Sequence, residues 1–293
     1  FPNGKVMNVE NTSIEFHATH VMGTIVAKGI SASARGLAFD ATGMSFKWDN
    51  DYDEMAGEAA AGMLVSNHSY WISPSGNLAR WMFGAYDNRA RQFDNIAVAA
   101  PYYLAVTAAG NDRNDFTNTV IGPYLNAKSG YNLLRGMQNA KNFLTVGAVN
   151  QVTNYISPQS VVMSDFSSWG PTDDGRIKPE IVTKGVAVMS TDSSGNSDYS
   201  SSQGTSMASP AIAGNALLLQ QYYNSLNTSY MRAATLKGLI LHTALEAGDD
   251  PGPDYMFGFG LINTEAAANL ITAKANQSAV IEEVNLNNNA TYT

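Results

Sequence analysis

Short apolar runs alternate along this chain with segments of helical spacing, and this alternation restricts the possible folds more than any other feature. The runs are bounded by Gly, Asn or Ser, and the clearest of them are residues 36–41, 62–70, 96–111, 142–149 and 179–191. Between them lie stretches such as residues 51–64, where Asp51 and Asp53 favour the positive end of a helix. Strands buried on both faces and alternating with helices indicate a parallel sheet that is covered on both sides. We therefore expect an α/β protein of three layers, α/β/α, with a mainly parallel central sheet.

Two long helices are predicted near the end of the domain, over residues 206–226 and 231–248, the second ending at Gly248 as its cap. After residue 275 the sequence changes to strand-like residues and a polar Asn turn. We predict one domain over residues 1–275, followed by a tail, residues 276–293, that begins a C-terminal β extension or a further domain.

The charge and composition exclude several kinds of partner and chemistry. The 293 residues carry a net charge of −8 without any run of Lys or Arg, which argues against nucleic acid and anionic membranes as partners. No apolar run approaches the roughly 20 residues that span a bilayer. The chain contains no Cys, so disulfides, Cys-based metal sites and thiol catalysis are excluded.

Ser206 is a candidate nucleophile because it lies where a Gly-containing turn meets the start of an apolar helix. A hydroxyl at that place lies close to free backbone N–H groups and the positive helix end, which stabilise an oxyanion. The alternative is that Ser206 only caps the helix. Asn111 ends an apolar strand, where its side-chain amide can point into the crevice of an open α/β sheet. An Asn in a turn is common, so neither residue is specific when it is taken alone.

A serine nucleophile needs a base, and the chain has four histidines: His17, His20, His68 and His242. The apolar helical surroundings of His242 indicate a core histidine with satisfied hydrogen bonds. His17 and His20 are spaced to share one side of a helix, which suggests metal binding. Metal is the weaker interpretation, because no third ligand follows at a suitable spacing.

Taken together, three of these segments resemble the subtilisin-like serine protease (subtilase) family. They are HATHVMGT (17–24), AAGN (108–111) and GTSMASP (204–210), and the segments SSWGP (167–171), KPEIV (178–182) and FGFGLINTEAA (257–267) support them. The resemblance extends from about Val6 to Ala275. It implies a subtilisin-like fold and hydrolysis of peptide bonds in peptide or protein substrates through an acyl-enzyme.

Position by position, the resemblance makes His17 the general base, Ser206 the nucleophile and Asn111 the oxyanion-hole amide, beside the backbone N–H of Ser206. His20 would be structural. No cofactor is required and no metal site is predicted. The family's calcium loop after the histidine helix is missing, and acidic clusters such as residues 49–54 are more typical of solvated loops. A structural calcium ion is compatible with the sequence but not indicated by it.

The family's triad also contains an Asp at the end of a central strand that precedes the histidine, and residues 1–16 contain no Asp. Glu15 is too close to His17 in sequence to reach its ring, and Glu10 lacks a strand to fix it. We expect the Asp to lie on a segment N-terminal to residue 1, so that this chain is a piece of a longer precursor. Without the strand that carries this Asp, its two neighbouring strands would have buried backbone groups left unpaired, at a cost of about 1–3 kcal/mol each.

Three explanations for the missing segment remain open. We favour a chain that was cut before Phe1, with its own N-terminal fragment still bound as a second chain. A sample that has lost the segment is the second explanation. The third is an inactive relative that uses the cleft only to bind peptides. An α/β-hydrolase is disfavoured, because no apolar strand leads into Ser206.

By resemblance, substrate is expected to lie between two segments. One consists of Ser69, Tyr70 and Trp71, and the other of Ala108, Ala109 and Gly110. The family has Gly where this chain has Trp71, so an indole would reshape the pocket, or turn outward against the insertion 72–95. The resemblance also implies a secreted, cell-surface or periplasmic protein of bacterial type.

Overall fold

A four-stranded parallel sheet forms the centre of the computed structural model, which describes residues 1–72, 78–285, 287, 289 and 291. The order of its strands is β3 (Val65–His68), β4 (Leu104–Ala108), β5 (Leu144–Val149) and β6 (Ile181–Lys184). Every residue of β4 and β5 is buried, which explains why these strands appear in the sequence as continuous apolar runs.

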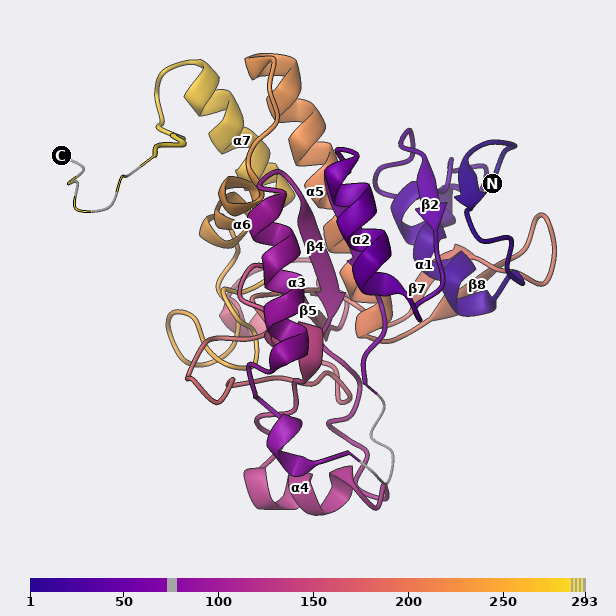
Figure 1. Cartoon of the computed structure of the whole chain (residues 1–293), viewed down its shortest axis with the longest axis vertical. Coiled ribbons are helices and arrows are strands. Elements are labelled where there is room, and N and C mark those ends of the chain that lie inside the picture. Colours follow the sequence, from indigo (N-terminus) through magenta and orange to yellow (C-terminus); the bar gives the residue numbers. More distant parts are fainter. Residues whose placement is uncertain (73–77, 286, 288, 290, 292–293) are drawn as a thin grey trace.

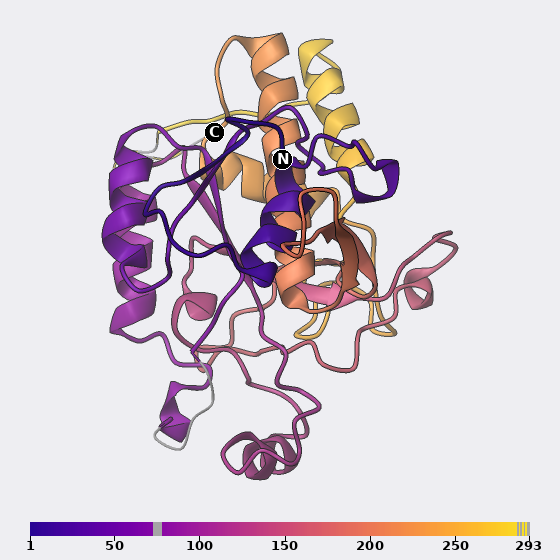
Figure 2. The same ribbon diagram turned by 90° about the vertical axis from the view of Figure 1, so that its right-hand side faces the viewer.

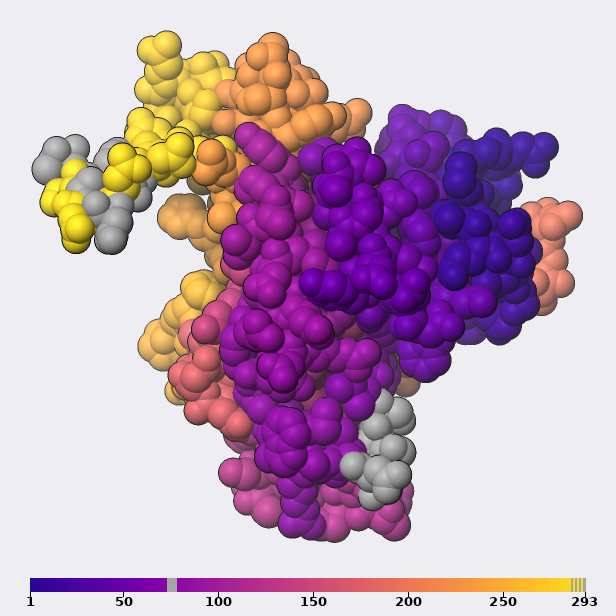
Figure 3. Space-filling model, in the orientation of Figure 1, coloured from indigo at the N-terminus to yellow at the C-terminus, as the bar shows by residue number. Residues whose placement is uncertain are grey.

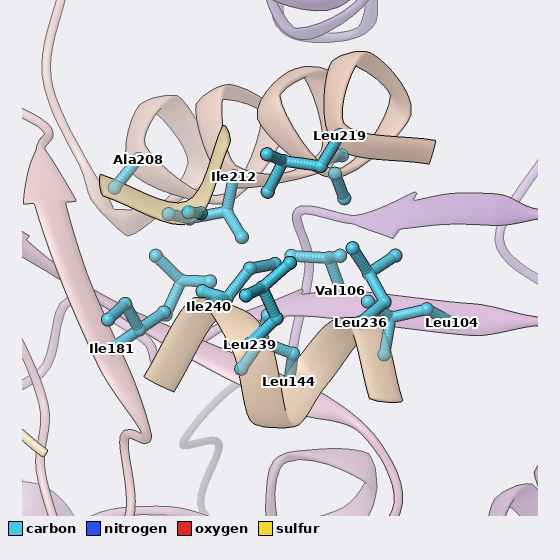
Figure 4. Close-up of a cluster of buried hydrophobic side chains, with 14 of the residues drawn as sticks. Leu104, Val106, Leu144, Ile181, Ala208, Ile212, Leu219, Leu236, Leu239 and Ile240 are labelled. Atoms are coloured by element: carbon cyan, nitrogen blue, oxygen red, sulfur yellow. The ribbon is translucent and has the colours of Figure 1, made fainter. Parts of the chain in front are cut away.

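Helices cover both faces of this sheet, so the predicted α/β/α architecture is confirmed (Figure 2). One face carries α2 (Asp51–Ala60) and α3 (Asn88–Ala99), and the other carries α5 (Thr205–Asn227), α6 (Ala233–His242) and α7 (Thr264–Ala275). Alternate strand residues separate the two cores. Leu104 and Val106 pack toward α5 and α6, as Figure 4 shows, while Ala105 packs with Phe93 and Phe143 on the opposite face.

A second, smaller sheet lies at the N-terminal side of the molecule (Figure 1). Its strands, β1 (Val6–Asn8) and β2 (Gly43–Ser45), are parallel, with Met7 opposite Met44. Among the described residues, β2 pairs only with β1, and β3 pairs only with β4. The parallel strands therefore form two separate sheets, and β3 is only partly buried where β4 and β5 are fully buried.

The first helix and a hairpin connect this side of the molecule to the central layers. Helix α1 (Phe16–Val26) packs against α5 and against the antiparallel hairpin of β7 (Val188–Thr191) and β8 (Tyr199–Ser202). The remaining helix, α4 (Ile121–Lys128), lies at the far end of the molecule in Figure 1. No helix in the described part of the chain is both long and apolar enough to cross a membrane.

Two predictions near α6 are wrong. The helix ends at His242, not at Gly248, because Leu245 exchanges two backbone hydrogen bonds of 2.8 Å with Leu261. Leu261 also bridges Val182 of β6, so strand pairing at the sheet edge replaces the last helical turns. His242 is consequently exposed at the end of α6 and is not a core histidine.

The first predicted strand is also wrong, because residues 36–41 form a turn that leads into β2. Residues 276–285 of the predicted tail form no strand, and they project from the side opposite the N-terminal residues in Figure 3. Residues 286, 288, 290 and 292–293 of the tail, and residues 73–77 of the predicted insertion, lie outside the described residues.

Candidate active site

Ser206 is buried in the first turn of α5, where two predicted site segments meet. Its hydroxyl donates a hydrogen bond to the carbonyl of Ser69 at 3.2 Å, and the Ser69 hydroxyl donates to the Ser206 carbonyl at 3.0 Å. Gly204 precedes the helix with φ 144°, and a Cβ there would lie 3.3 Å from Asn111 Nδ2. The tight turn needs glycine, and it brings the start of α5 close to Asn111.

The side chain of Asn111 is fixed by the residue before Ser206. Its Oδ1 accepts hydrogen bonds from the backbone N–H of Thr205 at 2.8 Å and from the Thr205 hydroxyl at 2.9 Å. The same hydroxyl accepts a 3.0 Å hydrogen bond from the N–H of Gly110. Because Oδ1 faces two donors, Nδ2 is the amide atom that remains to donate. In the first turn of α5 the N–H of Met207 donates to the Gly204 carbonyl at 3.0 Å, whereas the N–H of Ser206 has no acceptor among the described residues, so an anion is offered this N–H together with Asn111 Nδ2.

His17 lies in the first turn of α1 with its side chain exposed. Its pKa is lowered, first because neighbouring protein atoms displace water from the ring and second because His20 is close. The ring is therefore neutral at pH 7 and able to accept a proton. No described residue forms a hydrogen bond with it, and the Ser206 hydroxyl is directed to Ser69 instead.

His20, by contrast, is completely buried. Its Nε2 lies 3.1 Å from the carbonyl of Val188 and 3.2 Å from that of Ser200, so this nitrogen carries the proton. Ser190 donates a 2.8 Å hydrogen bond back to the His20 carbonyl. These bonds fasten α1 to the hairpin that leads into Ser206, which is a structural use of His20.

The two carboxylates near the N-terminus are engaged elsewhere. Glu15 accepts a 2.8 Å hydrogen bond from the hydroxyl of Ser13, and Glu10 accepts one from the backbone N–H of Lys47. Neither is hydrogen-bonded to His17. The described residues contain no group of three or more His, Cys, Asp or Glu side chains that could hold a metal ion.

A pocket of about 480 Å³ opens beside Asn111. Of the predicted substrate-binding residues, Ser69, Tyr70 and Trp71 line it together with Asn111. Trp71 is half-buried at this pocket. The sequence had left open whether its ring faces the pocket or turns outward against residues 72–95. The other lining residues were not predicted, and they are Trp48, Asp112, Asp115 and Asn118.

Ala108, Ala109 and Gly110 do not line the pocket. The side chains of Ala108 and Ala109 are buried. The Ala108 carbonyl accepts from Gln138 at 2.9 Å, and the Ala109 N–H donates to Val146 at 2.9 Å. Direct contact of these three residues with a substrate stays a prediction.

One wall of the pocket is held by a buried ion pair. Arg135 donates to Asp112 at 2.9 Å, and the two side chains are 0% and 7% exposed. Burial raises the pKa of Asp112, and the neighbouring Arg135 opposes that rise.

The sequence contained one local signal for Asp112, since this residue directly follows Asn111. Thr205 had a similar signal as the neighbour of Ser206, whereas Trp48 had none.

The sequence matches the model of the subtilase family over residues 3–260. Subtilisin DY of Bacillus licheniformis is 29% identical over 260 residues, which are 88% of this chain and 79% of that protein. The C5a peptidase of Streptococcus pyogenes serotype M3 is 33% identical over 160 residues, which are 51% of this chain and 13% of that protein.

Solved structures share the fold. The self-cleaved protease domain of PatA superposes with a TM-score of 0.65 at 21% identity, covering 92% of this chain and 89% of that one. The prenylagaramide maturation protease PagA has a TM-score of 0.67 at 20% identity, covering 92% and 87%. The family match spans most of the sequence and the fold agrees with it, so this chain belongs to the subtilase family of serine proteases.

Proposed function

We propose that this chain is the catalytic part of a serine endopeptidase that works through an acyl-enzyme on Ser206. His17 takes the proton of the Ser206 hydroxyl while Oγ attacks the peptide carbonyl, and it then gives the proton to the leaving amine. Water completes the hydrolysis by the same route in a second step. The observation that carries this proposal is the pair of Thr205 hydrogen bonds to Asn111 Oδ1, which leaves Nδ2 as a donor beside Ser206.

A triad also needs a carboxylate that orients His17, and none of the described carboxylates is bonded to it. The proposal therefore includes a strand that carries an Asp and inserts between β2 and β3. The separation of the two parallel sheets supports this, because β2 and β3 each have a partner on one side only within the described residues.

We infer that the strand comes from the N-terminal fragment of the same precursor and stays bound as a second chain. An intact mass spectrum of the denatured sample tests this directly. A second peptide whose sequence ends in an apolar strand with Asp is the expected result. If only the 31.3 kDa chain is found in a sample that hydrolyses peptides, the two-chain arrangement is wrong.

Labelling of Ser206 by a fluorophosphonate tests the assembled triad. The chain alone is expected to react slowly, and addition of a synthetic peptide containing the precursor's Asp strand is expected to accelerate labelling by roughly 10³-fold or more. The matched control is the same peptide with Asp replaced by Asn, which completes the sheet without supplying the carboxylate. The Ser206→Ala chain must remain unlabelled in every mixture.

The alternative function is an inactive subtilase-like module that only binds peptides. The lack of a hydrogen-bond partner for His17 among the described residues is the observation that favours it. If the chain is such a module, Ser206 should not react with the fluorophosphonate in the presence of either the Asp or the Asn strand peptide. Substrate-like peptides should still bind. Rapid labelling that depends on the Asp of the added strand contradicts it.

For location, we propose a secreted, cell-surface or periplasmic protein, on family likeness alone.

A further inference from the structure

The pocket beside Asn111 has aromatic walls. Trp48, Tyr70 and Trp71 all line it, and the rings of Trp48 and Tyr70 meet edge to face with centroids 6.2 Å apart. Indole and phenol faces attract cations as well as apolar groups. The charged residues of the pocket therefore decide which kind of side chain it accepts.

Two acidic residues, Asp112 and Asp115, line the pocket, and their charges are balanced differently. Asp112 is neutralised by Arg135 in the buried ion pair. No Lys or Arg among the described residues lies within 4.0 Å of the Asp115 carboxylate. The pocket consequently carries one uncompensated negative charge, which comes from Asp115.

The nearest basic residue in sequence does not change this balance. The guanidinium of Arg113 lies 3.9 Å from the ring centroid of Trp169 and donates to the carbonyl of Asp165. The loop that carries Asp115 is held by two backbone hydrogen bonds of 3.2 Å. The N–H of Asp115 donates to the backbone carbonyl of Asp112, and the N–H of Asn118 donates to the backbone carbonyl of Asp115. Asp115 is therefore on a hydrogen-bonded turn, and it lines the same pocket as Ser69 and Asn111.

We propose that this pocket binds a Lys or Arg side chain of the substrate, at the residue whose carbonyl is attacked, and that Asp115 determines this preference. The inference rests on the proposed function, since it concerns the substrate of the same site. A guanidinium or ammonium group gains a carboxylate partner and aromatic faces together, whereas a carboxylate side chain would be repelled.

Hydrolysis of matched peptides tests the proposal on the chain combined with its Asp strand. The peptides differ only at the residue before the cut, which is Arg, citrulline, Leu or Glu. Citrulline keeps the shape of Arg without its charge. We expect kcat/KM for Arg to exceed that for citrulline by roughly tenfold or more, the scale of one ion pair in a partly desolvated cleft. Asp115→Asn should abolish that ratio.

Asp250→Asn is the matched control, because it removes the same charge at an exposed residue that does not line the pocket. It should keep the preference for Arg over citrulline. Equal hydrolysis of the Arg and citrulline peptides, or an Arg preference that survives Asp115→Asn, overturns the assignment of Asp115 while the protease function stands.

Binding measurements keep the two proposals separate if no peptide is hydrolysed. The Ser206→Ala chain is titrated with the same peptides, and the change in tryptophan fluorescence, to which Trp48 and Trp71 of the pocket contribute, reports occupancy. Tighter binding of the Arg peptide than the citrulline peptide, lost on Asp115→Asn, supports the pocket even in an inactive module. Equal binding of the two peptides overturns it.

Discussion

Asn111 Oδ1 accepts both of its hydrogen bonds from Thr205, and the hydroxyl of Thr205 also accepts one from Gly110. Thr205 is fully buried, so one side chain fixes the strand end that carries Asn111 to the helix that carries Ser206. The alignment of the proposed oxyanion donors depends on this threonine rather than on either donor alone.

Thr205→Val should therefore lower kcat by roughly tenfold with little change in KM, because Asn111 loses one of two restraints. It should also lower the free energy of unfolding by about 1–3 kcal/mol, since the N–H of Gly110 becomes buried without an acceptor. Steady-state kinetics and urea unfolding measure the two effects. Thr205→Ser restores the hydroxyl and should recover most of both, and a Thr205→Val enzyme with unchanged kcat would show that Thr205 does not position Asn111.

The protonation of His17 should respond to the added strand. In the chain alone its pKa lies below the ordinary value near 6.5, through loss of water and the nearby His20. A carboxylate beside the ring favours its charged form and raises the pKa. Because the base must be neutral to act, the acid limb of kcat/KM should follow this higher value in the assembled enzyme.

An NMR titration of the His17 ring measures this change, with His17→Gln to assign its signal. The Asp peptide should raise the midpoint, and the Asn peptide should leave it close to that of the chain alone. If the Asp peptide binds without moving the midpoint, the carboxylate does not reach His17.

Much of the central sheet was predictable from the sequence, whereas the small sheet of β1 and β2 and the end of α6 were not. Strands β4 and β5 are buried on both faces, so nearly every residue in them is apolar and the run is visible without any partner. β1 and β2 have three residues each, and their pairing depends on segments more than 30 residues apart. The end of α6 was predicted wrongly because it also depends on a distant segment: pairing of Leu245 with Leu261 overrides the local helical spacing.

The candidate site divides in a similar way. His17, Asn111 and Ser206 became candidates because their motifs together resemble those of one family, and their catalytic roles stay predictions. The pocket that Asn111 lines is also formed by Trp48 and Asp115, which are more than 60 residues apart and carry no motif. Their proximity is produced by the tertiary fold, so only the structure could bring them into the argument.

His68 should make stability depend on pH. It is buried between the hydroxyls of Ser66 and Tyr70, each 2.7 Å from a ring nitrogen, and burial lowers its pKa to about 4. In the unfolded chain the ring takes up a proton below about pH 6.5, while in the folded protein it stays neutral down to about pH 4. Its contribution is present above pH 6.5 and is lost as the pH falls through this window, by up to about 3 kcal/mol.

Urea unfolding between pH 7.5 and 4 measures this loss. His68→Gln removes the titrating group and should give a flatter dependence of the unfolding free energy on pH. His242→Gln is the control, because His242 is exposed and should leave the slope as it is. Identical slopes in all three proteins would mean that His68 is not neutral in the folded state.

The ion pair between Arg135 and Asp112 should be costly to break from one side. Arg135 also donates to the carbonyls of Ile72 and Leu133, at 2.6 and 3.0 Å, so it joins Asp112 in the pocket wall to two other segments of the chain. Arg135→Met leaves a buried carboxylate unpaired and should lower the free energy of unfolding by about 3–5 kcal/mol at pH 7. Adding Asp112→Asn removes the stranded charge and should recover a large part of that loss. Lys28→Met, which breaks the exposed pair with Asp40, should change stability little, and a comparably small effect of Arg135→Met would contradict a buried, paired Asp112.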